Sequence, residues 1–202
     1  MKVLLIHGVL MRPVVMALLA KRLREAGHEV SSFGYSMRPS FQEVTAGFTS
    51  RVNAFRPDAI VGHSMGGVIA IRSAQLFNTP VSKILCLGSP LNGSAIAKKI
   101  AGSWLRFVFS EASEDLTVRG LAGCKAADTT VGVLAGTKGS LGFNLLFRVL
   151  SGVHDGTVAL GETKSPSADH HMELFEGHTS MLFSKKVADQ VRYFLESGSF
   201  KT

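Results

Sequence analysis

The 202-residue sequence predicts a single α/β domain, residues 1–202, built on a minimal open parallel sheet of about six strands with helices on both faces. Three observations support this fold class. The length suits one sizeable core and is short for two. Hydrophobic residues make up 46% of the chain and charged residues 18%, which favours buried strands over a disordered chain. Short apolar runs also alternate with longer helical patterns, as in βαβ units.

Six short runs have the length and composition of buried strands, with turn residues or helical patterns between them. An alternating arrangement of this kind brings successive strands into one parallel sheet. The predicted strands are residues 2–6, 29–34, 58–62, 83–88, 131–136 and 172–176.

The segments between these strands carry helix signals. A first helix is expected over 13–26, because Pro13 is tolerated in a first helical turn and Gly27 is a typical C-terminal stop. A second opens on the capping-box pattern Ser40-Phe41-Gln42-Glu43 and ends before Pro57. The last helix is predicted from Ser184 to Leu195, where apolar residues recur at helical spacing.

The pentapeptide Gly62-His63-Ser64-Met65-Gly66 stands between a predicted strand and a helix that runs to about Phe77. A sharp turn between strand and helix holds a serine in a strained backbone conformation, and it needs flanking glycines because side chains there would collide with the neighbouring elements. The helix N-terminus offers free N–H groups to developing negative charge. Ser64 is therefore the candidate nucleophile.

Together with His7-Gly8 after the first strand, the run Gly62-His63-Ser64-Met65-Gly66-Gly67 resembles the α/β-hydrolase superfamily, in particular its compact lipases and esterases. The resemblance covers 2–94 and 131–195. It implies a Ser-His-Asp triad that cleaves carboxylic esters of lipid or acyl type through an acyl-enzyme, with no metal or organic cofactor.

The fold places the catalytic base in the loop after the last strand, and His178 lies there in Gly177-His178-Thr179-Ser180. The other histidines have simpler interpretations. His7 resembles the structural histidine of the family's His-Gly loop, and His63 lies inside the turn, pointing away from Ser64. The adjacent pair His170 and His171 points to opposite sides and suits a surface or supporting role.

A carboxylate must orient the base, and Asp155 in His154-Asp155-Gly156-Thr157-Val158 is similar to the acid loop of many lipases. It lies well beyond the predicted strand end at Gly136, so Asp169 and Glu162 remain alternatives. The chain order Ser64, Asp155, His178 is that of the superfamily.

The family pattern implies an oxyanion hole made by the backbone N–H groups of Val9 and Met65, with Leu10 replacing Val9 if the loop is drawn one residue differently. Leu10, Leu91 and Trp104 are candidate substrate contacts. A small cap or acyl-binding wall is expected at 95–110, a sheet-covering helix at about 113–121, and a second apolar wall at 141–150. The alternative is that these apolar stretches are core.

The formal net charge of +7 comes from 22 scattered Lys and Arg residues against 15 acidic ones, so no nucleic-acid partner is expected. Basic residues beside exposed apolar ones would suit peripheral membrane contact. The apolar N-terminus is interrupted by His7 and Arg12 before a signal sequence is complete, which predicts a cytoplasmic protein. The sequence does not define the oligomeric state.

Two other functions fit the same residues. A thioesterase or acyltransferase would use the same triad, because fold and triad fix the acyl-enzyme but neither the leaving group nor the acceptor. A binding protein on the same fold would need no turnover, and the presence of all three triad residues argues against it.

Overall fold

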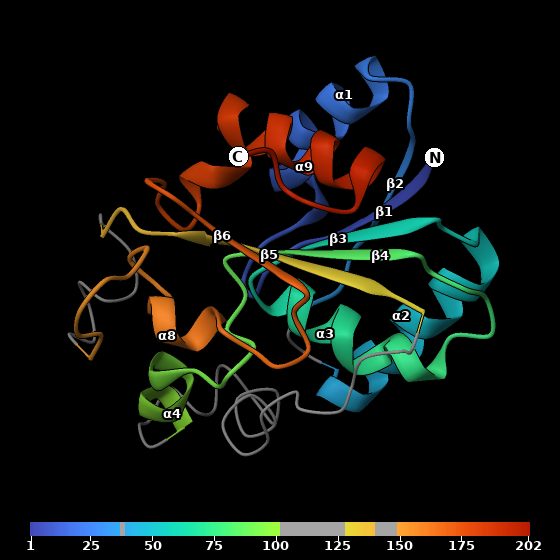
Figure 1. The fold of residues 1–202 in the computed structure, drawn as a ribbon. Coiled ribbons are helices and arrows are strands. Elements are labelled where there is room, and N and C mark those ends of the chain that lie inside the picture. Colours follow the sequence, from blue (N-terminus) through green and yellow to red (C-terminus); the bar gives the residue numbers. More distant parts are fainter. Residues whose placement is uncertain (37–38, 102–127, 140–148) are drawn as a thin grey trace.

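The computed structural model describes residues 1–36, 39–101, 128–139 and 149–202, which form a parallel sheet covered by helices on both faces (Figure 1). Hydrogen-bonded neighbours follow the order β2-β1-β3-β4-β5-β6, and every pairing is parallel. The strands are β1 (Lys2–Ile6), β2 (Glu29–Phe33), β3 (Ala59–His63), β4 (Lys83–Leu87), β5 (Thr130–Gly136) and β6 (His170–Leu174). The predicted open parallel sheet is confirmed.

The largest shift from the predicted strands occurs at β6, which was expected at 172–176 and lies two residues earlier. Its residues are partly exposed or exposed, whereas β3 is buried throughout. A buried central strand shows as an apolar run, but an edge strand can carry polar side chains such as those of His170 and His171. The apolar run alone therefore misplaced this strand.

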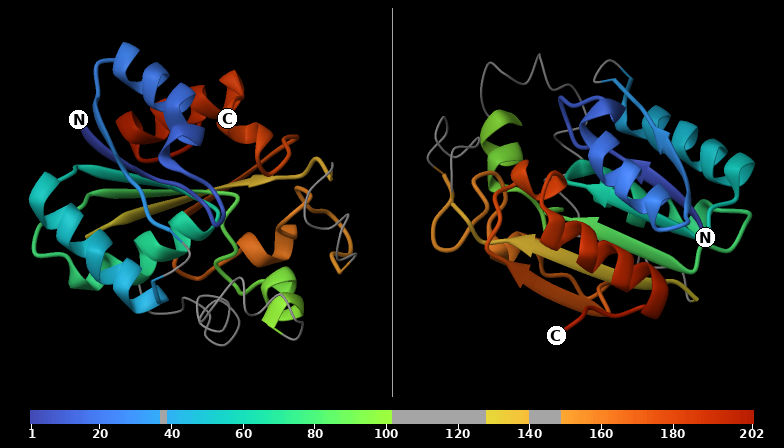
Figure 2. Two further views of the ribbon diagram at one scale, coloured as in Figure 1. Left: turned by 180° about the vertical axis from the view of Figure 1, so that it is seen from behind. Right: turned by 90° about the horizontal axis from the view of Figure 1, so that it is seen from above.

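Helices lie on both faces of the sheet, with α1 and α9 on one face and α2 and α3 on the other (Figures 1 and 2). The main helices are η1 (Pro13–Met16), α1 (Ala17–Glu25), α2 (Phe41–Phe55), α3 (Met65–Ser73), η2 (Ala74–Leu76), α4 (Ala95–Ala101), α8 (Leu160–Thr163), η3 (Ser180–Leu182) and α9 (Lys185–Ser197).

Local sequence signals explain several of these boundaries. The first predicted helix starts with a 3₁₀ turn at Pro13, so the α-helix proper begins at Ala17. The predicted capping box is present on α2: the Ser40 hydroxyl accepts from the Glu43 N–H, and the Glu43 carboxylate accepts from the Ser40 N–H. The helix ends at Arg56, which has left-handed φ of 53° directly before Pro57.

The sheet separates two hydrophobic clusters, because successive side chains of a strand point to opposite faces. Leu4 and Ile6 of β1 belong to the cluster under α2 and α3, while Val3 and Leu5 belong to the cluster under α1 and α9. In the described residues, no helix is long and apolar enough to cross a membrane.

The strand order reverses direction at β1, because β2 lies on one side of it and β3 on the other. Loops that leave the carboxyl ends of two such strands diverge and open a crevice, which is where open α/β sheets place their ligands. Ile6 of β1 pairs with Gly62 of β3, so two residues further on Gly8 lies beside Ser64. The topology therefore brings the loop after β1, which contains Gly8, next to the turn at Ser64.

Candidate functional site

Ser64 occupies a strained turn between β3 and α3. Its backbone has φ of 54° and ψ of −123°, a conformation that non-glycine residues rarely adopt. The Ser64 N–H donates to the Leu87 carbonyl at 2.8 Å, and α3 begins at the next residue. The side chain thus stands at the carboxyl end of the sheet, beside the N-terminus of a helix.

Two glycines allow this turn. A Cβ on Gly62 would lie 2.5 Å from the Gly67 nitrogen and 2.6 Å from the Gly66 carbonyl carbon, both of which are backbone atoms. A Cβ on Gly66 would collide with the Ile6 carbonyl oxygen. Strand and helix approach so closely here that only hydrogen fits.

Gly62→Ala is expected to lower the free energy of unfolding by about 1–3 kcal/mol or more, because the added methyl meets backbone that cannot rotate away. Gly161→Ala in α8 is the matched control, since a Cβ there meets nothing within 4 Å. Urea unfolding of the two variants checks this. Equal midpoints would contradict the account of the turn.

Asp155 and His178 form a buried, hydrogen-bonded pair. His178 Nδ1 lies 2.7 Å from Asp155 Oδ2, and the two residues are 7% and 2% exposed. The other carboxylate oxygen, Oδ1, accepts from the N–H groups of Thr157 and Val158 at 2.9 and 2.7 Å. The turn therefore fixes the carboxylate and leaves Oδ2 directed at the imidazole.

Asp155 reaches the strand ends although it follows β5 by many residues. A Cβ on Gly136, the last residue of β5, would lie 2.8 Å from Asp155 Cβ. A Cβ on Gly88, just after β4, would lie 3.1 Å from Asp155 Oδ2 and 3.2 Å from His178 Nδ1. Asp155 and His178 thus lie over the ends of β4 and β5, next to the strand that carries Ser64.

No hydrogen bond joins Ser64 to His178 among the described residues, although both side chains lie at the same edge of the sheet. Catalytic hydrogen bonds are commonly long without substrate and tighten when it binds. The neighbour of Ser64 contacts His178 directly: His63 Nε2 lies 2.9 Å from the His178 carbonyl oxygen, and the ring centroids are 4.7 Å apart.

The loop after β1 is held by His7 and Tyr35. His7 Nδ1 lies 2.8 Å from the Gly8 carbonyl oxygen, while its Nε2 accepts from the Tyr35 N–H at 3.3 Å. The two rings are stacked at 4.5 Å. The Gly8 carbonyl and the Val9 N–H belong to one trans peptide, in which C=O and N–H point in opposite directions. The bond between His7 Nδ1 and the Gly8 carbonyl therefore turns the Val9 N–H away from His7.

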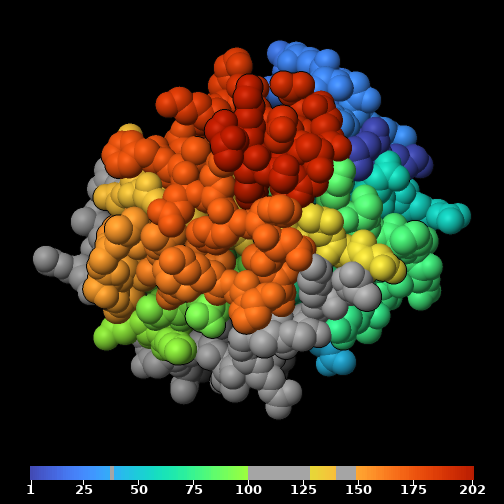
Figure 3. Space-filling model, in the orientation of Figure 1, coloured from blue at the N-terminus to red at the C-terminus, as the bar shows by residue number. Residues whose placement is uncertain are grey.

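The alternative acids have other partners. The Glu162 carboxylate accepts from the N–H groups of Ala95 and Ala159 at 2.5 and 2.8 Å, which ties the start of α4 to α8, and burial raises its pKa. Figure 3 shows this part of the chain packed against α4. Asp169 accepts from the Val131 N–H at the opposite end of β5. Of the three carboxylates, only Asp155 contacts His178.

Histidines 170 and 171 diverge as predicted, because they are successive residues of β6. The His171 ring hydrogen-bonds the Thr163 hydroxyl at 2.9 Å, and the His170 ring packs against Phe194. Among the residues that the structure describes, no three histidine, cysteine, aspartate or glutamate side chains are grouped to hold a metal ion.

The predicted substrate contacts differ in their exposure. Leu10 is 53% exposed and has left-handed φ of 57° in the loop after β1. Leu91 is only 1% exposed and belongs to the core cluster under α2 and α3, so it packs as core. Trp104, the predicted helix at 113–121 and most of the expected walls at 95–110 and 141–150 lie outside the described residues. Of the expected wall at 95–110, the structure describes the first part, which forms α4.

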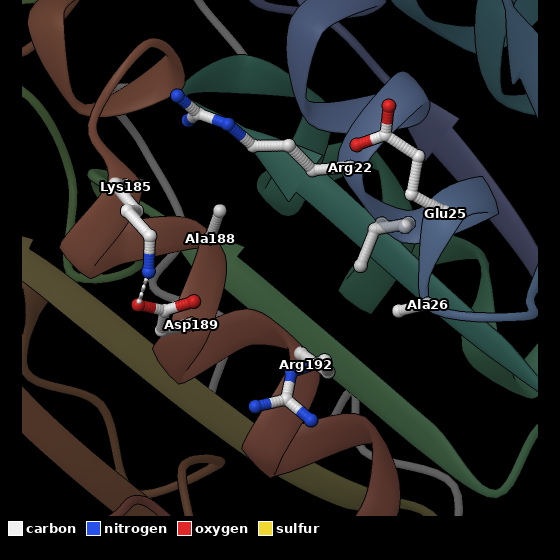
Figure 4. A pocket seen from close by; sticks show the side chains of 8 residues that line it. Arg22, Glu25, Ala26, Lys185, Ala188, Asp189 and Arg192 are labelled. Atoms are coloured by element: carbon white, nitrogen blue, oxygen red, sulfur yellow. Dashed lines mark hydrogen bonds and ion pairs between the residues drawn. The ribbon is translucent and has the colours of Figure 1, made fainter.

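A charged cleft of about 410 Å³ lies between α1 and α9 (Figure 4). Its charged lining includes Arg22, Glu25, Lys185, Asp189 and Arg192, and Lys185 pairs with Asp189 across one turn of α9. It contains none of the predicted site residues.

Burial lowers the pKa of His7 and of His63, the latter to about 3. An exposed histidine of the unfolded chain titrates near about 6.5, so as the pH falls below that value the unfolded chain takes up these protons before the folded chain does. The free energy of unfolding therefore decreases below about pH 6.5, by up to about 1.4 kcal/mol per pH unit for each buried ring.

Sequence reasoning assigned no role to the contacts that His63 and Glu162 make. His63 contacts a backbone atom 115 residues away in the sequence, and the bond between Glu162 and the Ala95 N–H spans 67 residues. The position of His63 beside the candidate nucleophile was the only signal for its contact. Nothing in the local pattern marks Glu162.

A family model described as a PGAP1-like alpha/beta domain matches residues 48–107. A comparison with curated proteins finds no match. Solved structures are similar in fold. The mature lipase BlEst2 of Bacillus licheniformis has 18% identity and a TM-score of 0.72, covering 96% of this chain and 90% of the lipase. In the propeptide form of that lipase, this chain spans 50% of the length.

A carboxylesterase structure from Nitrososphaera gargenis has 14% identity and a TM-score of 0.65, covering 96% of this chain and 89% of that one. Phospholipase PlaB from Legionella pneumophila has 18% identity and a TM-score of 0.63, covering 81% of this chain and 46% of PlaB. At such identities the likeness concerns the fold, and these neighbours are lipases and esterases.

Proposed function

Because this chain has the α/β-hydrolase fold, we propose that it is a serine hydrolase that cleaves carboxylic esters through Ser64, His178 and Asp155. The observation that carries the proposal is the buried pair of His178 and Asp155, joined at 2.7 Å at the strand ends beside the strained Ser64.

The hydrogen bonds of Asp155 support the proposed role of His178 as the general base. An ionised carboxylate only accepts, so the Nδ1 atom that faces it carries the proton of the neutral ring. The lone pair is then on Nε2, where a neutral imidazole can take the proton of the Ser64 hydroxyl. Asp155 stabilises the imidazolium that results, and Ser64 attacks the acyl carbon.

Negative charge on the tetrahedral intermediate needs backbone donors. Met65 is the first residue of α3, so its N–H has no partner within the helix. The Val9 N–H makes no hydrogen bond within the described part of the chain, and the Gly8 carbonyl before it is fixed by His7. These two N–H groups form the proposed oxyanion hole.

An acyl-enzyme then forms as the alcohol leaves with the proton from His178, and water releases the acid by the reverse sequence. No step needs a metal or organic cofactor. The half-exposed Leu10 beside Val9 supports acyl or lipid esters as the substrate class, because an apolar side chain borders the proposed oxyanion hole.

A fluorophosphonate probe tests the proposal directly, because it phosphonylates an activated serine. We expect one adduct, mapped to Ser64 by mass spectrometry, and much slower labelling of His178→Gln. His170→Gln, on the edge strand, should label like the wild type. A wild-type protein that stays unlabelled, or that labels equally after heat denaturation, would refute the proposed nucleophile.

A substrate panel then separates the esterase from its alternatives. Oxygen esters of increasing acyl length, the corresponding thioesters, and reactions with added alcohol acceptors compete for the same acyl-enzyme. We expect kcat/KM to be highest on oxygen esters. A clear preference for thioesters, or transfer to alcohol exceeding hydrolysis, would reassign the leaving group or acceptor without changing the triad.

A further inference from the structure

His63 lies between the nucleophile and the loop of the base. It is the last residue of β3, it is fully buried, and it precedes Ser64. Side chains alternate along a strand, so His63 points to the same face as Ala59 and Val61, which pack under α1 and α9. The loop 177–182 also packs on this face, since Met181 and Leu182 belong to the same cluster.

The loop of His178 has to cross the sheet to reach Ser64. It leaves β6, the edge strand, and β5 and β4 lie between that strand and β3. The backbone of His178 is held on both sides at the end of this path: its N–H donates to the Asp155 carbonyl at 2.9 Å, and its own carbonyl faces His63 Nε2 at 2.9 Å.

The direction of the second bond follows from its chemistry. A carbonyl oxygen only accepts, so His63 Nε2 carries a proton and donates it. Burial keeps the His63 ring neutral by lowering its pKa to about 3. A neutral ring also places no positive charge beside His178 when that side chain takes up the proton of Ser64, and a like charge at this distance would oppose proton uptake.

We propose that His63 is a positioning residue, which holds the backbone of His178 within reach of Ser64 through its Nε2–H bond to the His178 carbonyl. The proposal rests on the proposed serine hydrolase function. In this proposal, β3 positions both reacting groups. Its end carries Ser64, and its last residue, His63, holds His178. A displacement of about 1 Å between reacting groups can cost on the order of 100-fold in rate.

The test compares three variants of His63 on a soluble ester. His63→Leu keeps much of the volume and removes the donor. His63→Gln keeps an N–H donor at a similar reach, and His63→Asn carries the same amide one methylene shorter. We expect kcat to fall about 10- to 100-fold in the Leu and Asn variants with KM within about 3-fold, and Gln to restore most of kcat.

His28→Leu is the matched control, because His28 is a partly buried histidine at the opposite end of the sheet, directly before β2. It should leave kcat unchanged. Equal kcat for wild type and His63→Leu, or a loss in Gln as large as in Leu, would overturn the positioning role. If the Leu variant does not fold, the comparison of Gln with Asn decides.

Hydrogen exchange of the peptide 174–182 adds a readout that does not depend on activity. Without the His63 donor, the backbone of this loop should exchange faster, and Gln should restore protection. Unchanged exchange in His63→Leu and His63→Asn would contradict the contact itself. A wild-type protein with a protected loop but no reaction with esters or fluorophosphonate would refute the proposed function and leave this contact standing.

Discussion

Ser64→Ala is expected to lower kcat on a soluble ester by on the order of 10⁵- to 10⁶-fold, the largest effect of any single change in this protein. Without the hydroxyl no acyl-enzyme forms, and only binding and the proposed oxyanion N–H groups remain to assist water. Initial rates over a range of ester concentrations, at high enzyme concentration for the variant, measure the loss.

Ser73→Ala is the matched control for this change. Ser73 is the last residue of α3, the helix that follows Ser64, is also buried, and has a hydroxyl without a hydrogen-bond partner in the described residues. Removing the Ser73 hydroxyl should leave both kcat and the free energy of unfolding close to the wild-type values. A Ser64→Ala protein that keeps even a few per cent of the activity would exclude Ser64 as the nucleophile.

Asp155→Asn is expected to lower kcat by on the order of 10³- to 10⁴-fold, by the tautomer effect known from serine proteases. The N–H groups of Thr157 and Val158 require an acceptor at the Oδ1 position, so the asparagine oxygen should remain there. Its NH₂ group then faces His178 Nδ1 and stabilises the tautomer that carries the proton on Nε2. That ring cannot take a proton from Ser64.

Asp169→Asn provides the comparison, because Asp169 accepts from Val131 at the amino end of β5. We expect its kcat to stay within about 3-fold of the wild type, since the change lies outside the proposed triad. Both variants are measured across the pH range in which the wild type is folded. An Asp155→Asn enzyme as active as Asp169→Asn would return the choice of acid to the other carboxylates.

The buried histidines give a separate, thermodynamic expectation. Urea unfolding of the wild type and of His63→Gln should give free energies that fall with different slopes below about pH 6.5, because the variant lacks one group that protonates only when unfolded. The difference should approach about 1.4 kcal/mol per pH unit. Parallel slopes would show that His63 is protonated equally in both states.

Much of the fold was predictable because its signals are local. Strands show as short apolar or alternating runs, and β1 to β5 all begin and end within one residue of the prediction. The capping box of α2 was predictable for the same reason, since its two bonds join residues three positions apart. The edge strand β6 was placed two residues late, because its polar side chains do not form an apolar run.

The sequence by itself determined the serine in its strand-turn-helix setting, and the order in which a candidate acid and base follow it. These are properties of short segments, whose periodicity and glycines are visible without the rest of the chain. The tertiary structure decided which of three carboxylates contacts His178 and gave His63 and Glu162 their partners. Those contacts form only after the crossovers bring distant loops to one edge of the sheet, and no local spacing encodes that distance.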